Sequence, residues 1–191
     1  MTDTHVRNKR EELILPEWVT TDQLKDYYLN EWGEPVRDEQ GLYERICLEA
    51  FQVGLSWRLI LERRDSLRRA LEGFNPDVVA GLTEADVPAI LQLPGVIRNR
   101  AKVWACVVNA RATVALRGSG EYSDLVDLVW SFAPESWDPP TATRPRLEST
   151  PEATELAKAL KKAGFTFVGP TTCYALMEAC GLVDNRVRVS L

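Results

Sequence analysis

Apolar residues recur every three or four positions along most of this chain, the spacing that places them on one face of an α-helix. After Ser56, for example, Leu59, Ile60, Leu67 and Leu71 follow this spacing. The pattern predicts helices over about 21–28, 39–52, 56–72, 83–93, 98–116, 121–132, 150–162 and 170–181. Strand-like alternation is nearly absent, so an all-α fold is predicted.

Several predicted helix starts carry a side chain that can cap the first turn. Thr21, Ser56, Asn75 and Thr150 stand at such starts, and a proline follows Asn75 and Thr150 at the first helical position. Prolines between 133 and 149 indicate a loop. We therefore predict a flexible N-terminal arm over residues 1–15 and a single compact helical domain, with room for two lobes, over 16–190.

Composition places the chain among ordinary globular proteins, with 45% hydrophobic and 27% charged residues. No apolar run approaches the ~20 residues that span a bilayer. The first residues are polar and charged, unlike a secretory signal. We expect a cytoplasmic protein that makes no membrane contact. Its four cysteines, which lie in apolar segments, are expected to be reduced core thiols.

Charge is unevenly distributed along the sequence. The formal net charge of −5 argues against a general nucleic-acid binder. Segment 98–117, however, has no acidic residue and carries five basic ones, namely Arg98, Arg100, Lys102, Arg111 and Arg117. This segment is either a local phosphate-binding face or a helix with solvated basic side chains.

Glu49 is a lone carboxylate inside the apolar stretch 46–57. An unpaired charge in apolar surroundings is unfavourable by several kcal/mol. No lysine or arginine lies between Arg45 and Arg58 to pair with it locally. Either a cation distant in sequence reaches Glu49, or the site receives a cationic or hydrogen-bond-donating ligand.

The motif Leu93-Pro94-Gly95-Val96 lies between two predicted helices, over about 84–116, and precedes the basic segment. A glycine turn that leads into a helix start can present backbone N–H groups to a phosphate. This is the pattern of a helix-hairpin-helix, and the alternative is a plain turn between helices.

Aromatic residues cluster near the lone carboxylate in sequence. Tyr27, Tyr28 and Trp32 precede it, and Trp57 follows the turn after it. Such side chains can hold a flat base while a carboxylate bonds its edge, although ordinary core packing is the alternative for each of them. Metal-ligand spacings, nucleophilic triads and phosphate loops are absent from the sequence, and its single histidine is His5.

Longer motifs identify a resemblance. Asn30-Glu31-Trp32-Gly33, Ile46-Cys47-Leu48-Glu49, Gln52-Val53-Gly54-Leu55-Ser56-Trp57, Val96-Ile97-Arg98-Asn99-Arg100 and Gly164-Phe165-Thr166-Phe167-Val168-Gly169 occur in this order. Over roughly residues 16–190 the chain resembles 3-methyladenine DNA glycosylase I, the Tag-type branch of the helix-hairpin-helix DNA glycosylases.

The resemblance implies that the protein hydrolyses the N-glycosidic bond of 3-methyladenine in alkylated duplex DNA. The base would be flipped out of the helix, and the free base would be the product. Glu49 would bond the base edge, Tyr27 and Trp57 would pack on the two faces of the base, and Trp32 and Tyr28 would complete the pocket. Leu55 with Gly54 would fill the gap in the duplex. Phosphates would be held by Gly95, Val96, Arg98, Arg100 and Lys102.

The sequence also departs from the family pattern. Pro16, Tyr28, Arg186 and Ser190 stand where the family holds a zinc ion that ties the termini together. We therefore expect no zinc and no cofactor, with Tyr28 and Arg186 taking over part of the packing. No lysine lies in the pocket motifs, so hydrolysis without strand cleavage is expected. A monomer is expected. The alternatives are a glycosylase for other N3-alkylated purines and a non-catalytic DNA-binding domain.

Overall fold

The computed structural model describes residues 11–141 and 146–190. The expected arm therefore lies outside the described residues over its first ten positions, including His5. The elements are, in order, β1 (Glu11–Leu13), α1 (Asp22–Asn30), α2 (Glu39–Gln52), α3 (Trp57–Ala70), the 3-10 turn η1 (Glu72–Phe74), α4 (Pro76–Val79), α5 (Val87–Ile90), α6 (Arg100–Leu116), α7 (Leu125–Trp130), α8 (Pro151–Lys162), α9 (Pro170–Ala179) and β2 (Arg188–Ser190).

Capping side chains start most of these helices. The side-chain oxygens of Thr21, Ser56 and Thr150 accept hydrogen bonds from the backbone N–H groups of the first turns of α1, α3 and α8, as the sequence predicts. The helices predicted over 83–93 and 121–132 are shorter than expected. In the structure, hydrogen-bonded turns occupy much of both stretches, and the helical parts are α5 and α7.

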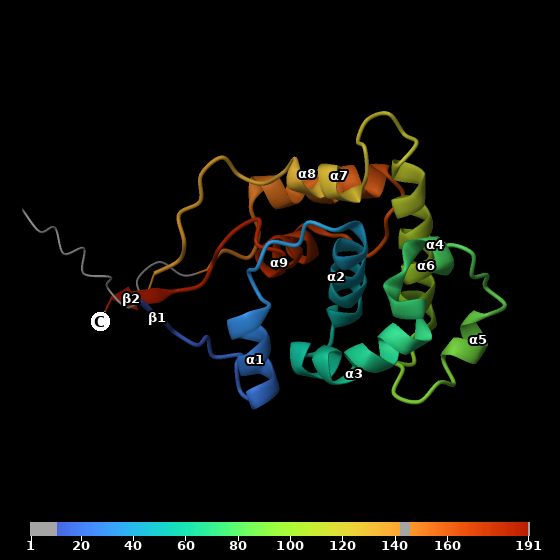
Figure 1. Ribbon diagram of the computed structural model, residues 1–191, viewed down its shortest axis with the longest axis horizontal. Coiled ribbons are helices and arrows are strands. Elements are labelled where there is room, and N and C mark those ends of the chain that lie inside the picture. The colour runs from blue at the N-terminus through green and yellow to red at the C-terminus, as the bar shows by residue number, and fades with distance from the viewer. Residues whose placement is uncertain (1–10, 142–145, 191) are drawn as a thin grey trace, which may run out of the picture.

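The fold is helical, and this confirms the predicted fold class. Helix α2 lies near the middle and contacts α3, α6, α7 and α9 (Figure 1). One hydrophobic core links these helices with α8, and the described cysteines are buried and unpaired within it. No helix in the two described ranges is both long and apolar enough to cross a bilayer.

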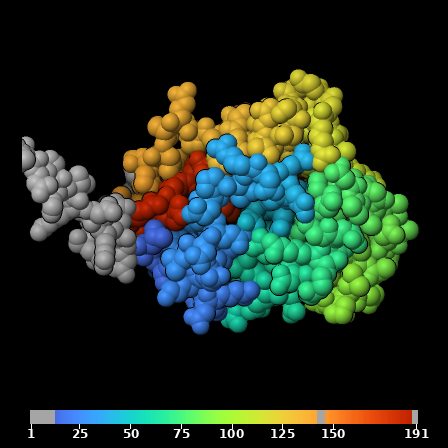
Figure 2. Space-filling model, viewed as in Figure 1, coloured from blue at the N-terminus to red at the C-terminus, as the bar shows by residue number. Residues whose placement is uncertain are grey.

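Residues 11–13 are not part of a free arm, which corrects the predicted boundary at residue 15. Strands β1 and β2 pair antiparallel, with Leu13 opposite Arg188. The Ile14 N–H continues the ladder by donating to the Val187 carbonyl oxygen at 2.9 Å. The two ends of the described chain therefore meet at one edge of the molecule (Figure 2).

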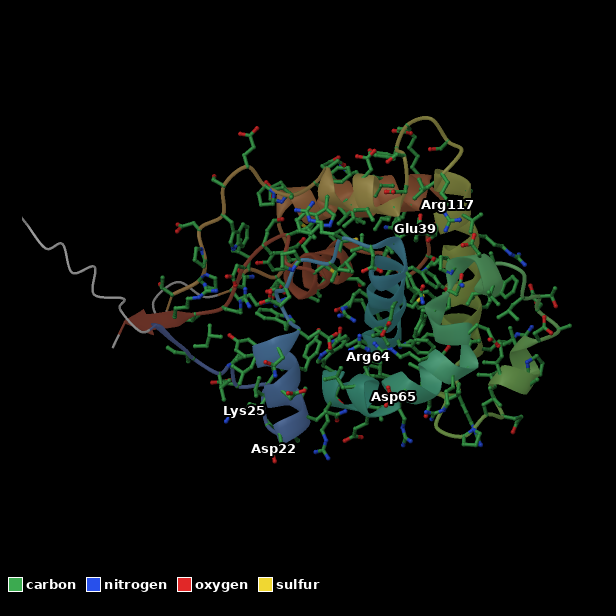
Figure 3. All side chains as sticks on the ribbon, viewed as in Figure 1. Asp22, Lys25, Glu39, Arg64, Asp65 and Arg117 are labelled. Atoms are coloured by element: carbon green, nitrogen blue, oxygen red, sulfur yellow. The ribbon has the colours of Figure 1, made fainter. Side chains whose placement is uncertain are left out.

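Buried ion pairs fix α1 and α3 against α2. Arg64 of α3 donates to Glu44 of α2 at 2.6 Å and to Glu31, just beyond α1, at 2.7 Å. Arg45 of α2 also pairs with Glu31. Figure 3 shows Arg64 reaching from α3 towards α2. Since both arginines are largely buried, these pairs hold the aromatic residues of α1 in a fixed place beside α2.

Candidate functional site

A cavity of about 710 Å³ opens between α1, α2, the start of α3 and α9. The C-terminal segment and the loop before α8 complete its wall. Its lining brings together five of the predicted site residues from three helices and a turn: Tyr27 and Tyr28 of α1, Trp32 in the turn after it, Glu49 of α2 and Trp57 of α3. The volume lies in the range of small-molecule binding sites.

Glu49 lies on the buried side of α2 and is 4% exposed. No described residue makes a hydrogen bond or ion pair to its carboxyl group. Burial raises the pKa of Glu49 to about 8, the negative charge of Glu178 adds to this rise, and Arg146 and Arg45 oppose it. The first alternative posed by the sequence, a distant cation bonded to Glu49, is therefore not found among the described residues.

The aromatic residues form one continuous cluster. Tyr28 stacks on Trp32 with ring centroids 5.3 Å apart, and Tyr27 contacts Trp57 at 5.5 Å with a 48° tilt. Tyr27 and Trp57 already touch, so a base cannot lie between them unless one ring moves. The predicted arrangement, with these two rings on opposite faces of a base, therefore does not fit the empty cavity.

Two polar atoms of this cluster lack a partner. The Tyr27 hydroxyl and the Trp57 indole N–H are buried without a hydrogen bond. Burial raises the pKa of Tyr27 well above its usual value, and the Glu49 charge adds to it. Buried polar groups are normally bonded, so unpaired groups around one cavity indicate a binding site.

The cavity also contains residues that were not predicted. Trp18 packs edge-on against Tyr28 at 5.6 Å. Glu178 of α9 is 2% exposed and accepts hydrogen bonds from Arg146 and Asn185. The sequence could have indicated Glu178, because it is a lone carboxylate in the apolar stretch 173–183. Glu49 was recognised by the same feature in the stretch 46–57. Trp18 and Asn185 gave no comparable signal.

The predicted hairpin is formed between α5 and α6. Gly95 has φ +80°, and a Cβ there would run into the Ser66 side chain of α3, so glycine is required at this turn. Asn99 caps α6 by accepting from the Lys102 N–H at 3.1 Å. Arg98 is exposed and no described residue pairs with it, whereas Arg100 pairs with Glu84 at 3.1 Å.

Two of the residues predicted to contact phosphate, Lys102 and Val96, have buried side chains. Lys102 is 5% exposed, and its ammonium group donates to the carbonyl oxygens of Phe51 and Val53 at the end of α2. Helical periodicity turns this side chain inward, so its charge is not on the outer face. The Val96 side chain is buried in the core, and its N–H donates to the Leu93 carbonyl oxygen.

The rest of the basic segment is engaged within the protein. Arg111 donates to the carbonyl oxygens of Ala80 and Leu82 at 3.0 and 2.6 Å. Arg117 pairs with Glu39 and Asp77, and Figure 3 shows Arg117 beside Glu39. The five basic residues therefore do not form one continuous phosphate-binding face.

Gly54 and Leu55 form the turn that joins α2 to α3 beside the cavity. Gly54 has φ +78° and is exposed, and Leu55 is half-buried against the core. Val53 next to them is 47% exposed. This partly exposed apolar turn lies between Gln52 and Ser56, which both line the cavity.

The residues at the family's zinc positions do not fit a metal. The Tyr28 hydroxyl donates to the Ile14 carbonyl oxygen at 3.2 Å. Arg186 is a cation that donates to Glu34 at 2.6 Å and to Asp184 at 2.9 Å. Pro16 has no side-chain atom that can bind a metal. Within 11–141 and 146–190, no group of three or more His, Cys, Asp or Glu residues could hold a metal ion.

The structure agrees with what the resemblance implies, a helix-hairpin-helix DNA glycosylase: the domain is helical, a Pro-Gly hairpin lies between α5 and α6, and a separate aromatic cavity contains a buried carboxylate. A family model described as methyladenine glycosylase matches residues 18–190, and the chain belongs to that family. It is 46% identical to the DNA-3-methyladenine glycosylase of Haemophilus influenzae over 166 residues, which cover 85% of this chain and 88% of the relative.

Solved structures agree with this assignment. A crystal structure of 3-methyladenine DNA glycosylase I superposes with a TM-score of 0.82 at 42% identity, over 88% of this chain and 92% of the other. A second, a single-residue variant of 3-methyladenine DNA glycosylase I in complex with 3-methyladenine, gives a TM-score of 0.79 at 28% identity, over 88% and 90% of the two chains.

Proposed function

We propose that this protein is a base-excision repair glycosylase that releases 3-methyladenine from alkylated duplex DNA. The relatives named for this activity support the assignment, as does the complex of one of them with the base. Because these relatives are bacterial enzymes that act on DNA, we also propose a cytoplasmic location, and we propose that the protein acts as a monomer.

The observation that carries the proposal is the unpartnered, buried carboxyl group of Glu49. An N3-methylated adenine in DNA carries a positive charge. When such a base enters the cavity, it supplies the counter-charge that Glu49 lacks and lowers the pKa of the carboxyl group. Binding therefore favours the cationic base over unmodified adenine, which brings no charge.

The aromatic cluster is proposed to hold the flipped base. Trp57 offers a broad surface at the cavity wall, and Tyr27, Tyr28 and Trp32 shape the remainder. Because Tyr27 and Trp57 touch in the empty cavity, we propose that the base stacks on one of them or that the two rings separate on binding.

The bond to be broken needs little acid–base assistance. A cationic base is a good leaving group, and a desolvated carboxylate near it stabilises charge as the bond breaks. No lysine lines the cavity among the described residues, so no amine is available there to form a Schiff base with the sugar. We therefore propose that water bonds to the sugar carbon from which the base departs, and that the DNA strand stays intact.

The turn at Gly54 and Leu55 is proposed to fill the space left by the flipped nucleotide. We propose that the hairpin at Gly95 holds the phosphate backbone of the DNA. The exposed Arg98 and Arg100, of which Arg100 pairs with Glu84 at the surface, are proposed to assist it. Lys102 is instead proposed to hold the end of α2 in place, because its ammonium group bonds two carbonyl oxygens there.

A second candidate activity is excision of bulkier N3-alkylated purines. The cavity of about 710 Å³ is lined by Ile14, Pro16 and Val187 as well as by the aromatic cluster and Glu49. This volume is favourable for a substituent larger than methyl. Comparing release rates from DNA treated with methylating and ethylating agents distinguishes the two activities.

Base release tests the proposal. Wild-type protein is expected to release 3-methyladenine and leave the strands uncut, whereas Glu49→Gln is expected to bind the same DNA with most of the activity lost. Glu155→Gln, in an exposed pair with Lys158 on α8, is the matched control and keeps its activity. If wild type binds DNA and releases no base from any alkylated substrate, the protein is a binding domain.

A further inference from the structure

The cavity holds a second carboxylate. Glu178 of α9 lines the same cavity as Glu49 and is 2% exposed. Unlike Glu49, it is fully bonded. One of its oxygens accepts from the Arg146 Nε at 2.5 Å and from the Asn185 Nδ2 at 2.6 Å, and the other accepts from the Arg146 Nη2.

Neighbouring groups hold this arrangement in place. Asn185 also donates to the Tyr174 hydroxyl at 2.8 Å and accepts from the Trp137 indole N–H at 3.0 Å. The Arg146 guanidinium lies 5.1 Å from the centre of the Tyr174 ring. Arg146 reaches this position from the loop before α8, with its side chain about half exposed to solvent. A bidentate pair of this kind is directional as well as strong.

Two carboxylates in one desolvated cavity cannot both carry charge without a cation, because like charges in low dielectric repel strongly. Arg146 supplies that cation to Glu178 and leaves the Glu49 carboxyl group facing the aromatic cluster. If Glu178 and Glu49 were both unpaired, the cavity would suit a dication or would bind a proton in place of the base.

The charged and titratable groups around Glu49 come from several elements. Burial raises the pKa of Glu49 most, followed by the charge of Glu178, while Arg146 and Arg45 lower it. Arg45 is already paired with Glu31. Within 11–141 and 146–190, Glu49 also interacts electrostatically with Tyr27 of α1 and with the thiols of Cys173 and Cys180.

We infer that Arg146 and Glu178 are positioning residues that set the charge of the cavity: their ion pair neutralises the second carboxylate, so that Glu49 receives a base with a single positive charge. This inference rests on the proposed function of Glu49. It adds that the Arg146–Glu178 pair controls the protonation of Glu49. It concerns residues on α9 and the loop before α8, which lie far in sequence from the aromatic motifs.

Direct titration of Glu49 by ¹³C NMR of its side-chain carboxyl carbon tests the inference without catalysis. The signal is assigned by its loss in Glu49→Gln. In Glu178→Gln, which keeps the side-chain size, the midpoint of Glu49 is expected to fall by about one pH unit, a shift typical of one nearby charge. In Arg146→Met the midpoint of Glu49 is expected to rise. In the double variant Arg146→Met/Glu178→Gln the midpoint is expected to return towards the wild-type value.

Activity is expected to follow the same order. Well below the pKa, a tenfold larger proton dissociation constant gives a tenfold larger ionised fraction, so Glu178→Gln raises kcat/KM at pH 6.5 by up to about tenfold. Arg146→Met is expected to lower kcat/KM at pH 6.5, and the activity of this variant is expected to recover at higher pH. Arg146→Lys keeps the positive charge, so the Glu49 midpoint is expected to stay close to wild type in Arg146→Lys and to fall in Arg146→Lys/Glu178→Gln as it does in Glu178→Gln. These two variants keep the test decisive if Arg146→Met does not fold.

The outcomes separate the inference from the proposed function. An unchanged Glu49 midpoint in both Glu178→Gln and Arg146→Lys/Glu178→Gln overturns the charge-setting role. An equal shift in Arg117→Met, which breaks an exposed arginine pair with Glu39 and Asp77, also overturns it. Shifted midpoints with an unshifted pH profile of base release support the charge-setting role and overturn the catalytic role of Glu49.

Discussion

Replacing Glu49 by glutamine is expected to make the free protein more stable, in a pH-dependent way. The pKa of Glu49 rises from its usual 4.5 to about 8 on burial, because the folded protein disfavours the charged form. A carboxyl group with a raised folded-state pKa contributes its stability fully below the unfolded-state pKa. That contribution is lost as the pH rises through the folded-state pKa.

The magnitude follows from the two pKa values. Each tenfold difference in proton affinity corresponds to about 1.4 kcal/mol. Above pH 9 the ionised, buried Glu49 therefore lowers the free energy of unfolding by about 5 kcal/mol, and at pH 7 by about 3 kcal/mol. Glutamine cannot ionise, so the variant gains these amounts relative to wild type and gains little at pH 4.

Urea unfolding of both proteins at several values between pH 4 and pH 9 measures this difference. For a chain of this length, a gain of about 3 kcal/mol raises Tm by roughly 6–12 °C. Glu155→Gln, with its carboxylate on the surface of α8, is expected to show no such trend. A stability difference between wild type and Glu49→Gln that does not change with pH would instead show that Glu49 is paired or solvated in the folded protein.

Three further variants test the aromatic cavity wall, the proposed phosphate contact and the buried ion pairs. Trp57→Ala is expected to lower kcat/KM for base release by roughly 10- to 100-fold, since stacking on an aromatic side chain contributes about 1–3 kcal/mol per base; unchanged kinetics would remove Trp57 from the site. Arg98→Ala is expected to weaken DNA binding equally for all sequences and to reduce the slope of log affinity against log salt by about 1, and an unchanged slope would exclude a phosphate contact. Arg64→Met leaves buried Glu44 short of a partner and is expected to lower the free energy of unfolding by about 3–5 kcal/mol, with the half-exposed Arg68→Met as the milder comparison in the same urea assay.

The features that could be predicted from the sequence depend on nearby residues. A capping side chain such as Thr21, Ser56 or Thr150 acts on the turn that immediately follows it, so its role can be read from the order of residues. The glycine at position 95 is likewise determined by a local turn. The buried state of Glu49 followed from its apolar neighbours along one helix.

The features that were missed depend on contacts between distant segments. Strands β1 and β2 are three residues each and are separated by most of the chain, so neither gave a recognisable pattern. The partner of Glu178 comes from a loop more than thirty residues earlier, as the Arg146 contact shows.

Lys102 was counted with the basic segment and predicted to contact phosphate, but its side chain lies on the buried face of α6. Lys102, Cys106 and Asn109 recur at the spacing of one helix face, and all three are buried. The same periodicity that predicted the helix also indicates that this lysine points inward. Charge counts on helices are therefore informative only after the buried face is assigned.

We propose that this protein releases 3-methyladenine from DNA and that Glu49, in its aromatic cavity, is required for the release. Chromatography and mass spectrometry of the bases set free from methylated duplex DNA test this most directly. Wild type is expected to release 3-methyladenine and to leave the strands intact, and Glu49→Gln is expected to release little of the base. Equal release by both proteins, or release of a different base as the main product, would contradict it.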